Sequence, residues 1–364
     1  MNKSEARLAT EVARPIGPDT GCQTREILRA AEVVVDVRAP GEFAKGAIAG
    51  AVHIPLFADA ERAEIGTLYK HAGRGEAIAR GLDLAGGHLR EFVQSFERFR
   101  GRRLLVYCAR GGMRSASVVS LLSSLGHSAS QLPGGYKAYR QFLLAELERQ
   151  IPPRLIVIHG QTGVGKTPIL RRLDNSLDLE DMAQHRSSLF GGVNRRPRTQ
   201  QQFESSLLHR LLELDFARPV WVEGESRKVG PVSIPSGLMR AMKSGSMVLL
   251  TASVPTRVRR IIAEYDGSDP DTMPQLEAAL LSLKHLFGNN RTLELAARLR
   301  AGHMEEVVET LLVDYYDPRY AHAMGNYSYA LTLPAEDPDA CAEALRAFAE
   351  REAGRFSVPA AHAG

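Results

Sequence analysis

The sequence predicts an α/β protein with two parallel-sheet domains and a helical C-terminal part. Two short apolar runs, at residues 102–108 and 154–160, are each followed by a glycine-containing loop and then by a helical pattern. Beyond residue 264 the apolar residues recur with the 3.6-residue period of helices. Hydrophobic residues make up 44% of the 364 residues and charged residues 24%, which is typical of a globular chain with two or three domains.

The first domain is expected over residues 1–150. EVVVDVR (32–38) and RRLLVYC (102–108) predict buried parallel strands, and SASVVSLLSSLG (115–126) predicts a helix that ends at its glycine. GGYKAYRQFLLAELERQIPP (134–153) predicts a closing helix that ends at a pair of prolines, and we place the domain boundary there.

A second α/β domain is expected over residues 151–263. RLIVIHG (154–160), VWVEGE (220–225) and SMVLLTASV (246–254) predict its strands. Residues 264–364 predict a helical C-terminal subdomain, because QLEAALLSLKHLFG and two later segments combine helical periodicity with glycines near their ends.

The sequence gives no sign of a membrane or secretory protein. The N-terminal residues have no apolar run typical of a signal peptide, and no segment is long and apolar enough to cross a bilayer. We therefore expect a cytoplasmic protein with no membrane partner. Cys22, Cys108 and Cys341 are far apart and lack metal-ligand spacing, so free thiols are expected and no metal site is certain.

Charge is distributed unevenly along the chain. Lysine and arginine outnumber acidic residues by 21 to 16 in residues 1–150 and by 17 to 9 in residues 151–263, whereas residues 264–364 carry 8 against 17. A polyanion such as RNA could therefore lie across the first two parts and avoid the third. A solvated surface with uneven charge is the alternative interpretation.

Cys108 stands between a predicted strand and a predicted helix. The backbone N–H groups of residues 109–115 are therefore expected to surround whatever the sulfur holds. A helix N-terminus and nearby arginines favour the thiolate, which is the nucleophilic form, and a glycine pair allows a tight turn. The sequence predicts a catalytic Cys108 in an anion-binding loop with Arg110, Gly111, Gly112, Arg114 and Ser115.

Two chemistries fit this loop. The spacing from Cys108 to Arg114 is also that of cysteine-dependent phosphatases, in which the thiolate attacks phosphorus. In a chalcogen transferase the thiolate accepts sulfur or selenium instead. The loop contains no aspartate to act as a general acid, which favours transfer over phosphatase chemistry.

GQTGVGKT, at residues 160–167, fits the pattern of a phosphate-binding loop and lies between a predicted strand and a predicted helix. Backbone N–H groups of such a loop surround a diphosphate, the lysine adds positive charge and the threonine can bind a magnesium ion. The predicted diphosphate site consists of Gly160, Gln161, Thr162, Gly163, Val164, Gly165, Lys166 and Thr167.

The use of this loop for ATP is left open by the sequence. An ATPase usually has a second apolar strand that ends in an aspartate for the metal, whereas the corresponding strand here ends in Glu223 or Glu225. A diphosphate ligand that is not hydrolysed for energy is therefore kept as an alternative to ATP hydrolysis.

The first domain resembles the rhodanese domain. The segment DVRAPGEFAKGAIAGAVHIP (36–55) carries the resemblance, with Asp36, Arg38 and Glu42 at recurring positions of that domain. We expect these residues to be structural, because a turn and a buried ion pair explain them.

The whole chain is similar to the tRNA 2-selenouridine synthase family. Besides the two loops, the resemblance rests on PGGYKAYR (133–140), DLEDMAQHRSSLFG (178–191), TQQQFE (199–204) and VEGESRKVGPVSIP (222–235). The chain departs from the family at Ala109, Ser187 and Gly224, where relatives often have tryptophan, glycine and aspartate.

This resemblance implies a rhodanese-like parallel-sheet domain, then a P-loop α/β domain with a C-terminal helical subdomain. It also implies that a tRNA with 2-thiouridine at the wobble position is S-geranylated by geranyl diphosphate and that selenium from selenophosphate then displaces the geranylthio group. On this interpretation residues 160–167 hold the prenyl diphosphate and Cys108 carries selenium. A contact with an enzyme that produces selenophosphate is also expected.

The resemblance also suggests roles for residues outside the two loops. Candidates for support of the diphosphate or of a metal are His185, Glu223, Glu225, Ser226 and Arg227, and candidates for tRNA phosphate contacts are Arg195, Arg196, Arg198, Arg257, Arg259 and Arg260. The rival hypotheses are an ATP-dependent tRNA sulfurtransferase, a cysteine-dependent phosphatase fused to a nucleotide-binding module, and a non-catalytic tRNA-binding scaffold.

Overall fold

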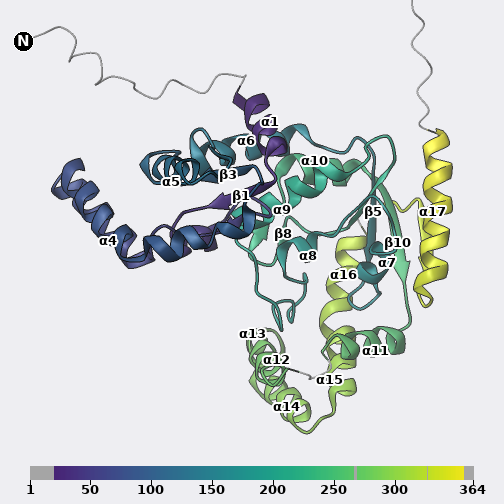
Figure 1. The fold of residues 1–364 in the computed structure, drawn as a ribbon. Coiled ribbons are helices and arrows are strands. Elements are labelled where there is room, and N and C mark those ends of the chain that lie inside the picture. The colour runs from purple at the N-terminus through teal and green to yellow at the C-terminus, as the bar shows by residue number, and fades with distance from the viewer. Residues whose placement is uncertain (1–19, 266–268, 326, 356–364) are drawn as a thin grey trace, which may run out of the picture. The chain divides into compact units, whose positions relative to one another are not determined.

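The computed structural model describes residues 20–265, 269–325 and 327–355 (Figure 1). The chain divides into two compact units, Met1–Ala145 and Glu146–Gly364. Each unit has its own parallel sheet and its own hydrophobic core. In the part of the chain that the structure describes, no helix is both long and apolar enough to cross a membrane.

The sheet of the first unit has four parallel strands in the order β2-β1-β3-β4. Val33 to Asp36 of β1 pair with Leu104 to Tyr107 of β3, so these two strands end at the same edge of the sheet. β3 is buried throughout, as expected for a parallel strand covered on both faces. The strands are β1 (Val33–Asp36), β2 (Val52–His53), β3 (Leu104–Tyr107) and β4 (Ala129–Gln131).

Helices cover this sheet and extend beyond it. α5 packs its buried Val118 and Leu122 against β3, in the same core as phenylalanines from the end of α4 and the turn after it. α3 and α4 follow β2 and precede β3 along the chain, and they lie side by side. α4 bends at His88, whose φ is −133° (Figure 1). The helices are α1 (Thr20–Ala30), α2 (Pro40–Lys45), α3 (Asp59–His71), α4 (Arg74–Gln94), α5 (Met113–Ser124) and α6 (Gly135–Arg149), with a 3-10 turn at Glu97–Phe99.

The sheet of the second unit has five parallel strands in the order β11-β10-β5-β7-β6. β5 lies at its centre, and Ile158 of β5 pairs with Glu223 at the end of β7. Ile156 and Ile158 pack into a core covered by α7 and α17. The strands are β5 (Leu155–Gly160), β6 (Ser176–Leu177), β7 (Val220–Glu223), β10 (Ser246–Thr251) and β11 (Leu331–Pro334), with a separate antiparallel pair β8 (Lys228–Val229) and β9 (Val232–Ser233).

The helical part that the sequence predicts is present, and it has its own core of leucines and aromatic residues. The chain then returns to the sheet, because β11 pairs with β10 and α17 packs on α7, so residues 264–364 do not form a separate unit. The remaining helices are α7 (Lys166–Leu170), α8 (Leu179–Ala183), α9 (Gln200–Glu213), α10 (Ser236–Ser244), α11 (Val254–Glu264), α12 (Thr272–Leu281), α13 (Lys284–Phe287), α14 (Asn289–Arg300), α15 (Met304–Leu311), a π-helical turn (Leu312–Tyr316), α16 (Asp317–Met324) and α17 (Pro338–Arg355).

Candidate functional site

Cys108 lies directly after β3, and only 3% of its surface is exposed. Ser115 Oγ donates a hydrogen bond to Cys108 Sγ over 3.1 Å. Burial raises the pKa of this thiol, but the Ser115 hydroxyl and the backbone N–H groups of Ser115, Arg110 and Gly112 outweigh it. The pKa of Cys108 therefore lies below its ordinary value, and the loop favours the thiolate.

Two glycines are required where the segment 133–140 packs on the cysteine loop. Gly111 has a φ of +61°, and a Cβ there would lie 2.7 Å from Gly134 N. Gly135 has a φ of +57°, and its Cβ would lie 2.3 Å from Cys108 O. Tyr136 N donates to the same oxygen over 2.8 Å. The two segments therefore hold each other in place around the sulfur.

The arginines of the loop have different surroundings. Arg114 forms a two-pronged ion pair with Glu42, at 2.7 and 3.3 Å, whereas Arg110 is exposed. Gln131 Nε2 donates to Ser115 Oγ over 2.8 Å and so orients the hydroxyl that contacts the sulfur. Arg110 is thus the loop arginine that is open to an approaching anion.

The rhodanese-like residues Asp36 and Arg38 form a buried ion pair, as the sequence predicts. Arg38 Nη2 lies 2.6 Å from Asp36 Oδ2, and both side chains are almost inaccessible to solvent. The guanidinium carbon of Arg38 also lies 3.9 Å from the centre of the Tyr136 ring. These residues are therefore structural.

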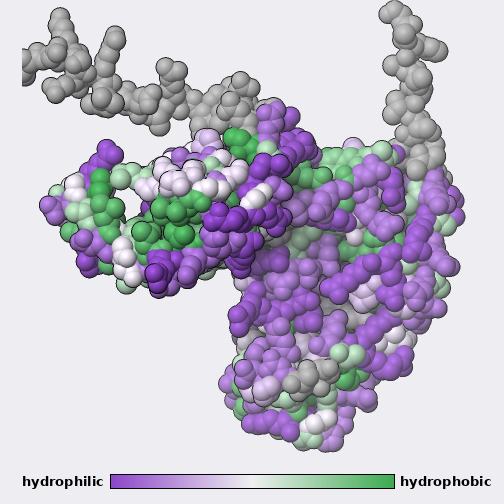
Figure 2. Space-filling view, viewed as in Figure 1, coloured by the Kyte–Doolittle hydropathy of each residue, from purple (hydrophilic) through white to green (hydrophobic). Residues whose placement is uncertain are grey.

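A cleft of about 1100 Å³ opens beside Cys108 in the first unit. Figure 2 shows hydrophobic side chains gathered on the face of this unit that carries α4 and α5. The apolar lining includes Leu56, Phe57, Ile65, Ile78, Leu82 and Met113. The basic lining consists of Arg62, Lys70, Arg74, Arg110 and Arg114. Cys108 therefore lies in the wall of a large cleft that combines apolar surface with positive charge.

The phosphate loop has the backbone that its glycines predict. Gly163 and Gly165 have φ angles of +79° and +94°, and a Cβ at Gly163 would lie 2.9 Å from Ile261 Cδ1. Lys166 Nζ donates to Gly160 O over 3.0 Å, as expected for a lysine folded back over the loop. α7 starts at Lys166, so the first backbone N–H groups of this helix have no acceptor within it.

Arg257 and Arg260 hold this loop from α11. Arg257 is 1% exposed, and it donates to Thr162 O over 2.8 Å and to Asp317 over 2.6 and 2.9 Å. Arg260 Nη1 donates to Val164 O over 2.6 Å. The prediction that Arg257 contacts tRNA is therefore wrong, because its guanidinium is buried and its donors are satisfied inside the protein. Arg260 is half-buried and likewise supports the loop.

Three glutamates meet beside the phosphate loop. Oxygen atoms of Glu180, Glu223 and Glu225 all lie within 4.8 Å of one another. Glu223 is fully buried, and its Oε1 accepts from Glu180 N over 2.6 Å while its Oε2 has no hydrogen-bond partner. Thr167 Oγ1 lies 3.5 Å from Glu180 Oε2.

Burial and mutual repulsion govern the protonation of these glutamates. Burial is the main cause that raises the pKa of Glu225 to about 7, although Lys166 opposes it. Burial, with Glu180 and Glu225 adding to it, holds the pKa of Glu223 well above its usual value. Burial disfavours the charged form of Lys166, but Tyr320 and the glutamates outweigh it and raise the pKa of Lys166.

This donor set fits a hard divalent cation. Mg²⁺ prefers oxygen ligands, and an orphaned buried carboxylate oxygen among repelling carboxylates is stabilised when a cation binds. Glu180, Glu223 and Glu225 would hold the ion, with Thr167 beside it. The resulting site differs from the expected one because Glu180, on α8, was not among the candidate metal residues.

His159 explains the glycine at position 224. A Cβ on Gly224 would lie 1.8 Å from His159 Cδ2, so the imidazole fills the space that a side chain would need. His159 Nδ1 lies 3.0 Å from Tyr329 Oη, and its ring is edge-on to Tyr327 at 4.6 Å. Burial, with a smaller contribution from Lys166, lowers the pKa of His159 to about 4.

The other predicted supports are placed differently. His185 lies against two glycine backbones, with its Cγ 2.3 Å from a Cβ built on Gly230 and its Cε1 2.6 Å from one built on Gly191. Ser226 and Arg227 are exposed, and Ser226 Oγ donates to Lys228 O over 2.8 Å. The structure thus brings Glu223 and Glu225 together at the phosphate loop but places Ser226 in the segment that leads into β8.

The remaining candidate tRNA contacts are partly accessible. Arg196 and Arg259 are exposed, and Arg195 is half-buried. Arg198 Nη1 donates to Met182 O over 3.1 Å and to Ser206 Oγ over 2.9 Å, so it fastens its own segment. Arg196 and Arg259 are therefore the candidates of this group that are open to a phosphate.

Comparison with known proteins identifies the relatives of this chain. A family described as the tRNA 2-selenouridine synthase AAA domain matches residues 153–352, and the rhodanese-like domain matches residues 23–142. The tRNA 2-selenouridine synthase of Bordetella bronchiseptica is 36% identical over 322 residues, which cover 79% of this chain and 87% of that protein. The chain belongs to the tRNA 2-selenouridine synthase family. The synthases of Hahella chejuensis and Bordetella petrii are each 34% identical, over 80% and 89% of this chain and 85% and 98% of their own lengths.

Membership of the tRNA 2-selenouridine synthase family confirms the resemblance and the fold class expected from the sequence. Four residues of the site in this family member are not among the residues predicted from the sequence, namely Gln131, His159, Glu180 and Tyr320. Glu42 was expected to be structural, and it pairs with Arg114 of the cysteine loop. Of the four, Glu180 lies in a segment on which the resemblance rests, and the other three do not.

Proposed function

We propose that this protein converts 2-thiouridine at the wobble position of tRNA to 2-selenouridine through S-geranyl-2-thiouridine. The strongest support is that one chain carries two anion sites with different chemistry. One is a cradle that favours a thiolate at Cys108, and the other is a phosphate loop with carboxylates for a cation. An enzyme with two successive transfers needs both.

The first step takes place at the phosphate loop. The diphosphate of geranyl diphosphate binds to the N–H groups of residues 160–167 and to Lys166. The sulfur of 2-thiouridine attacks C1 of the geranyl group, the C1–O bond breaks, and diphosphate leaves with the electron pair. A Mg²⁺ ion held by the three glutamates would neutralise charge on the leaving diphosphate. The half-buried Lys166 supplies a positive charge for the same purpose.

The second step replaces the geranylthio group by selenium. Alkylation makes this exchange favourable, because a thioether sulfur at C2 leaves as geranylthiol far more readily than a thione sulfur leaves. Selenide attacks C2 and the C2–S bond breaks. The large cleft at Cys108 suits a base that carries an apolar substituent, and its basic residues suit the tRNA phosphates.

The electron balance assigns the role of Cys108 in releasing selenium. If the thiolate captured selenium from selenophosphate as a selenylsulfide, phosphorus would be left as phosphite. If the thiolate attacks phosphorus instead, the P–Se bond breaks, selenide is released, and water later cleaves S-phosphocysteine to phosphate. Only the second route needs no change of oxidation state, so we assign attack on phosphorus to Cys108. This proposal replaces the expectation that Cys108 carries selenium, because selenium leaves as selenide and the thiolate holds the phosphoryl group.

Mass analysis of 2-thiouridine tRNA tests both steps. Geranyl diphosphate alone should add a geranyl group, and selenophosphate should then replace the geranylthio group by selenium. Lys166→Ala should stop the first reaction, whereas Cys108→Ser should stop only the second. An unchanged tRNA mass with geranyl diphosphate would refute the assignment of the phosphate loop. Turnover with thiosulfate and ATP would support a sulfurtransferase instead, and phosphate release without RNA a phosphatase.

A further inference from the structure

A cavity of about 370 Å³ opens directly from the phosphate loop in the second unit. One side of it is formed by the loop residues from Thr162 to Pro168. Further lining comes from α11, from α15 and from the π-helical turn that follows α15. A ligand whose phosphates lie in the loop would therefore extend its remaining part into this cavity.

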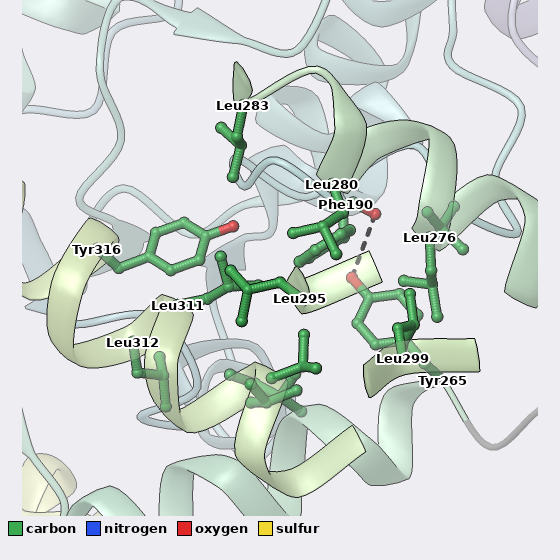
Figure 3. Close-up of a cluster of buried hydrophobic side chains, with 14 of the residues drawn as sticks. Phe190, Tyr265, Leu276, Leu280, Leu283, Leu295, Leu299, Leu311, Leu312 and Tyr316 are labelled. Atoms are coloured by element: carbon green, nitrogen blue, oxygen red, sulfur yellow. Dashed lines mark hydrogen bonds between the residues drawn. The ribbon is translucent and has the colours of Figure 1, made fainter. Parts of the chain in front are cut away.

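The cavity lining combines charged and apolar side chains. Lys166, Glu180 and Arg186 are among the charged residues that line it. Buried apolar and aromatic side chains from α11, α15 and the π-helical turn also line it, among them Ile261, Val308, Leu311, Leu312 and Tyr316. Figure 3 shows Leu311, Leu312 and Tyr316 within the hydrophobic cluster of this helical part. A charged end and an apolar wall match an amphipathic ligand with a phosphate head and a hydrocarbon tail.

The backbone is irregular where it forms this wall. Residues Leu312–Tyr316 form a π-helical turn between α15 and α16. Such turns insert an extra residue into a helix and are frequent at functional sites. The hydroxyl of Tyr316 accepts a hydrogen bond from Leu189 N over 3.0 Å, which satisfies its polar atom within the apolar wall.

Tyr320 lies where the charged and the apolar parts of the cavity lining meet. It lies one turn beyond Tyr316, lines the cavity, and has its ring centre 6.0 Å from Lys166 Nζ. The lysine that is expected to bind phosphate is therefore next to an aromatic ring that starts the apolar wall. This is where the junction between a diphosphate and its hydrocarbon group would lie.

We propose that this cavity binds the hydrocarbon tail of a ten-carbon prenyl diphosphate, with Ile261, Val308, Leu311 and Leu312 in contact with the tail. The inference rests on the proposed function, because it takes the head group of the ligand to be the diphosphate held by residues 160–167. The inference extends the proposed function by naming the residues that select the prenyl group. The cavity lies near the lower end of the size range of ligand sites, about 300–1,000 Å³, which favours a short tail over a longer one.

Filling the cavity from its edge is the sharpest test. Ala263 lines the cavity and is exposed on the last turn of α11, so Ala263→Phe adds a ring without disturbing the core. The matched control is Ala297→Phe, an exposed alanine of α14 that does not line the cavity. We expect Ala263→Phe to raise KM for geranyl diphosphate about tenfold, the loss for roughly two methylene groups kept out of the cavity. Inhibition by inorganic diphosphate, which has no tail, should not change.

A second variant tests the selection of chain length. Val308→Ala removes two methyl groups from the apolar wall and so enlarges the cavity. It should raise the ratio of farnesyl to geranyl transfer when both diphosphates compete. An unchanged KM in Ala263→Phe, together with an unchanged ratio in Val308→Ala, would overturn the inference about the cavity. If the wild type still transfers the geranyl group, the proposed function remains intact in that case. If the wild type transfers no geranyl group yet binds geranyl diphosphate more tightly than inorganic diphosphate, the proposed function fails and the tail site stands.

Discussion

The hydrogen bond between Ser115 and Cys108 gives a quantitative prediction. Ser115→Ala removes the hydroxyl that lies 3.1 Å from the sulfur and leaves the backbone N–H donors in place. Both residues are buried, so water does not replace the lost donor readily. The thiolate should therefore become less stable, and the pKa of Cys108 should rise.

The size of this effect follows from the loss of one donor to a charged acceptor. Such a hydrogen bond contributes about 1.5–3 kcal/mol. Because one pKa unit corresponds to about 1.4 kcal/mol, the pKa of Cys108 should rise by about 1–2 units. At a pH below the pKa of Cys108 in the unsubstituted protein, the thiolate fraction, and with it the rate of selenation, should fall about ten- to a hundredfold.

The pH dependence of alkylation by iodoacetamide measures this pKa. Peptide mass analysis separates Cys108 from Cys341, a buried thiol whose pKa is raised chiefly by burial and which serves as an internal reference. The matched control is Ser120→Ala, an exposed serine of the same helix α5. An alkylation profile of Cys108 that is the same in Ser115→Ala and in Ser120→Ala would refute the reasoning.

Three further predictions concern chemistry, metal binding and stability. Phosphorus NMR of a complete selenation reaction should show phosphate as the product, and phosphite would exclude attack of Cys108 on phosphorus. Glu223→Gln should weaken Mg²⁺ binding about ten- to a hundredfold in calorimetric titrations, whereas the exposed Glu213→Gln should not, and equal affinities would remove Glu223 from the site. Arg257→Leu removes a buried guanidinium that pairs with the half-buried Asp317, and it should lower the free energy of unfolding by about 1–3 kcal/mol in urea denaturation. Arg259→Leu, on the exposed face of α11, should change it by less than about 0.5 kcal/mol, and a similar small loss for Arg257→Leu would contradict the role of Arg257 as a support of the loop.

The two loops could be predicted from the sequence because their structure is local. Cys108 directly follows β3 and Lys166 begins α7, and each loop joins a buried strand to a helix over a short spacing of glycines and charged residues. The long strands β5 and β10 were also predicted. The short strands β2 and β6, of two residues each, have too little pattern to be predicted.

The rest of the site depends on contacts between residues far apart in the sequence. Glu42 pairs with Arg114 across 72 positions, and Arg257 pairs with Asp317 across 60. An arginine on an amphipathic helix has the same sequence signal whether it faces solvent or a buried carboxylate. For this reason Arg257 was predicted to contact tRNA although it supports the phosphate loop. The apolar wall of the cavity could not be predicted either, because leucines that line a ligand cavity and leucines of a hydrophobic core have the same pattern in the sequence.

The buried Arg257 has a thermodynamic consequence for substrate binding. Its guanidinium contacts Thr162 O in the phosphate loop and Asp317, which directly follows the π-helical turn of the cavity wall. A ligand that shifts either element changes the contacts of the other, so the free energies of binding at the two ends need not add. Inorganic diphosphate and a free hydrocarbon alcohol would then change each other's affinity by the same factor.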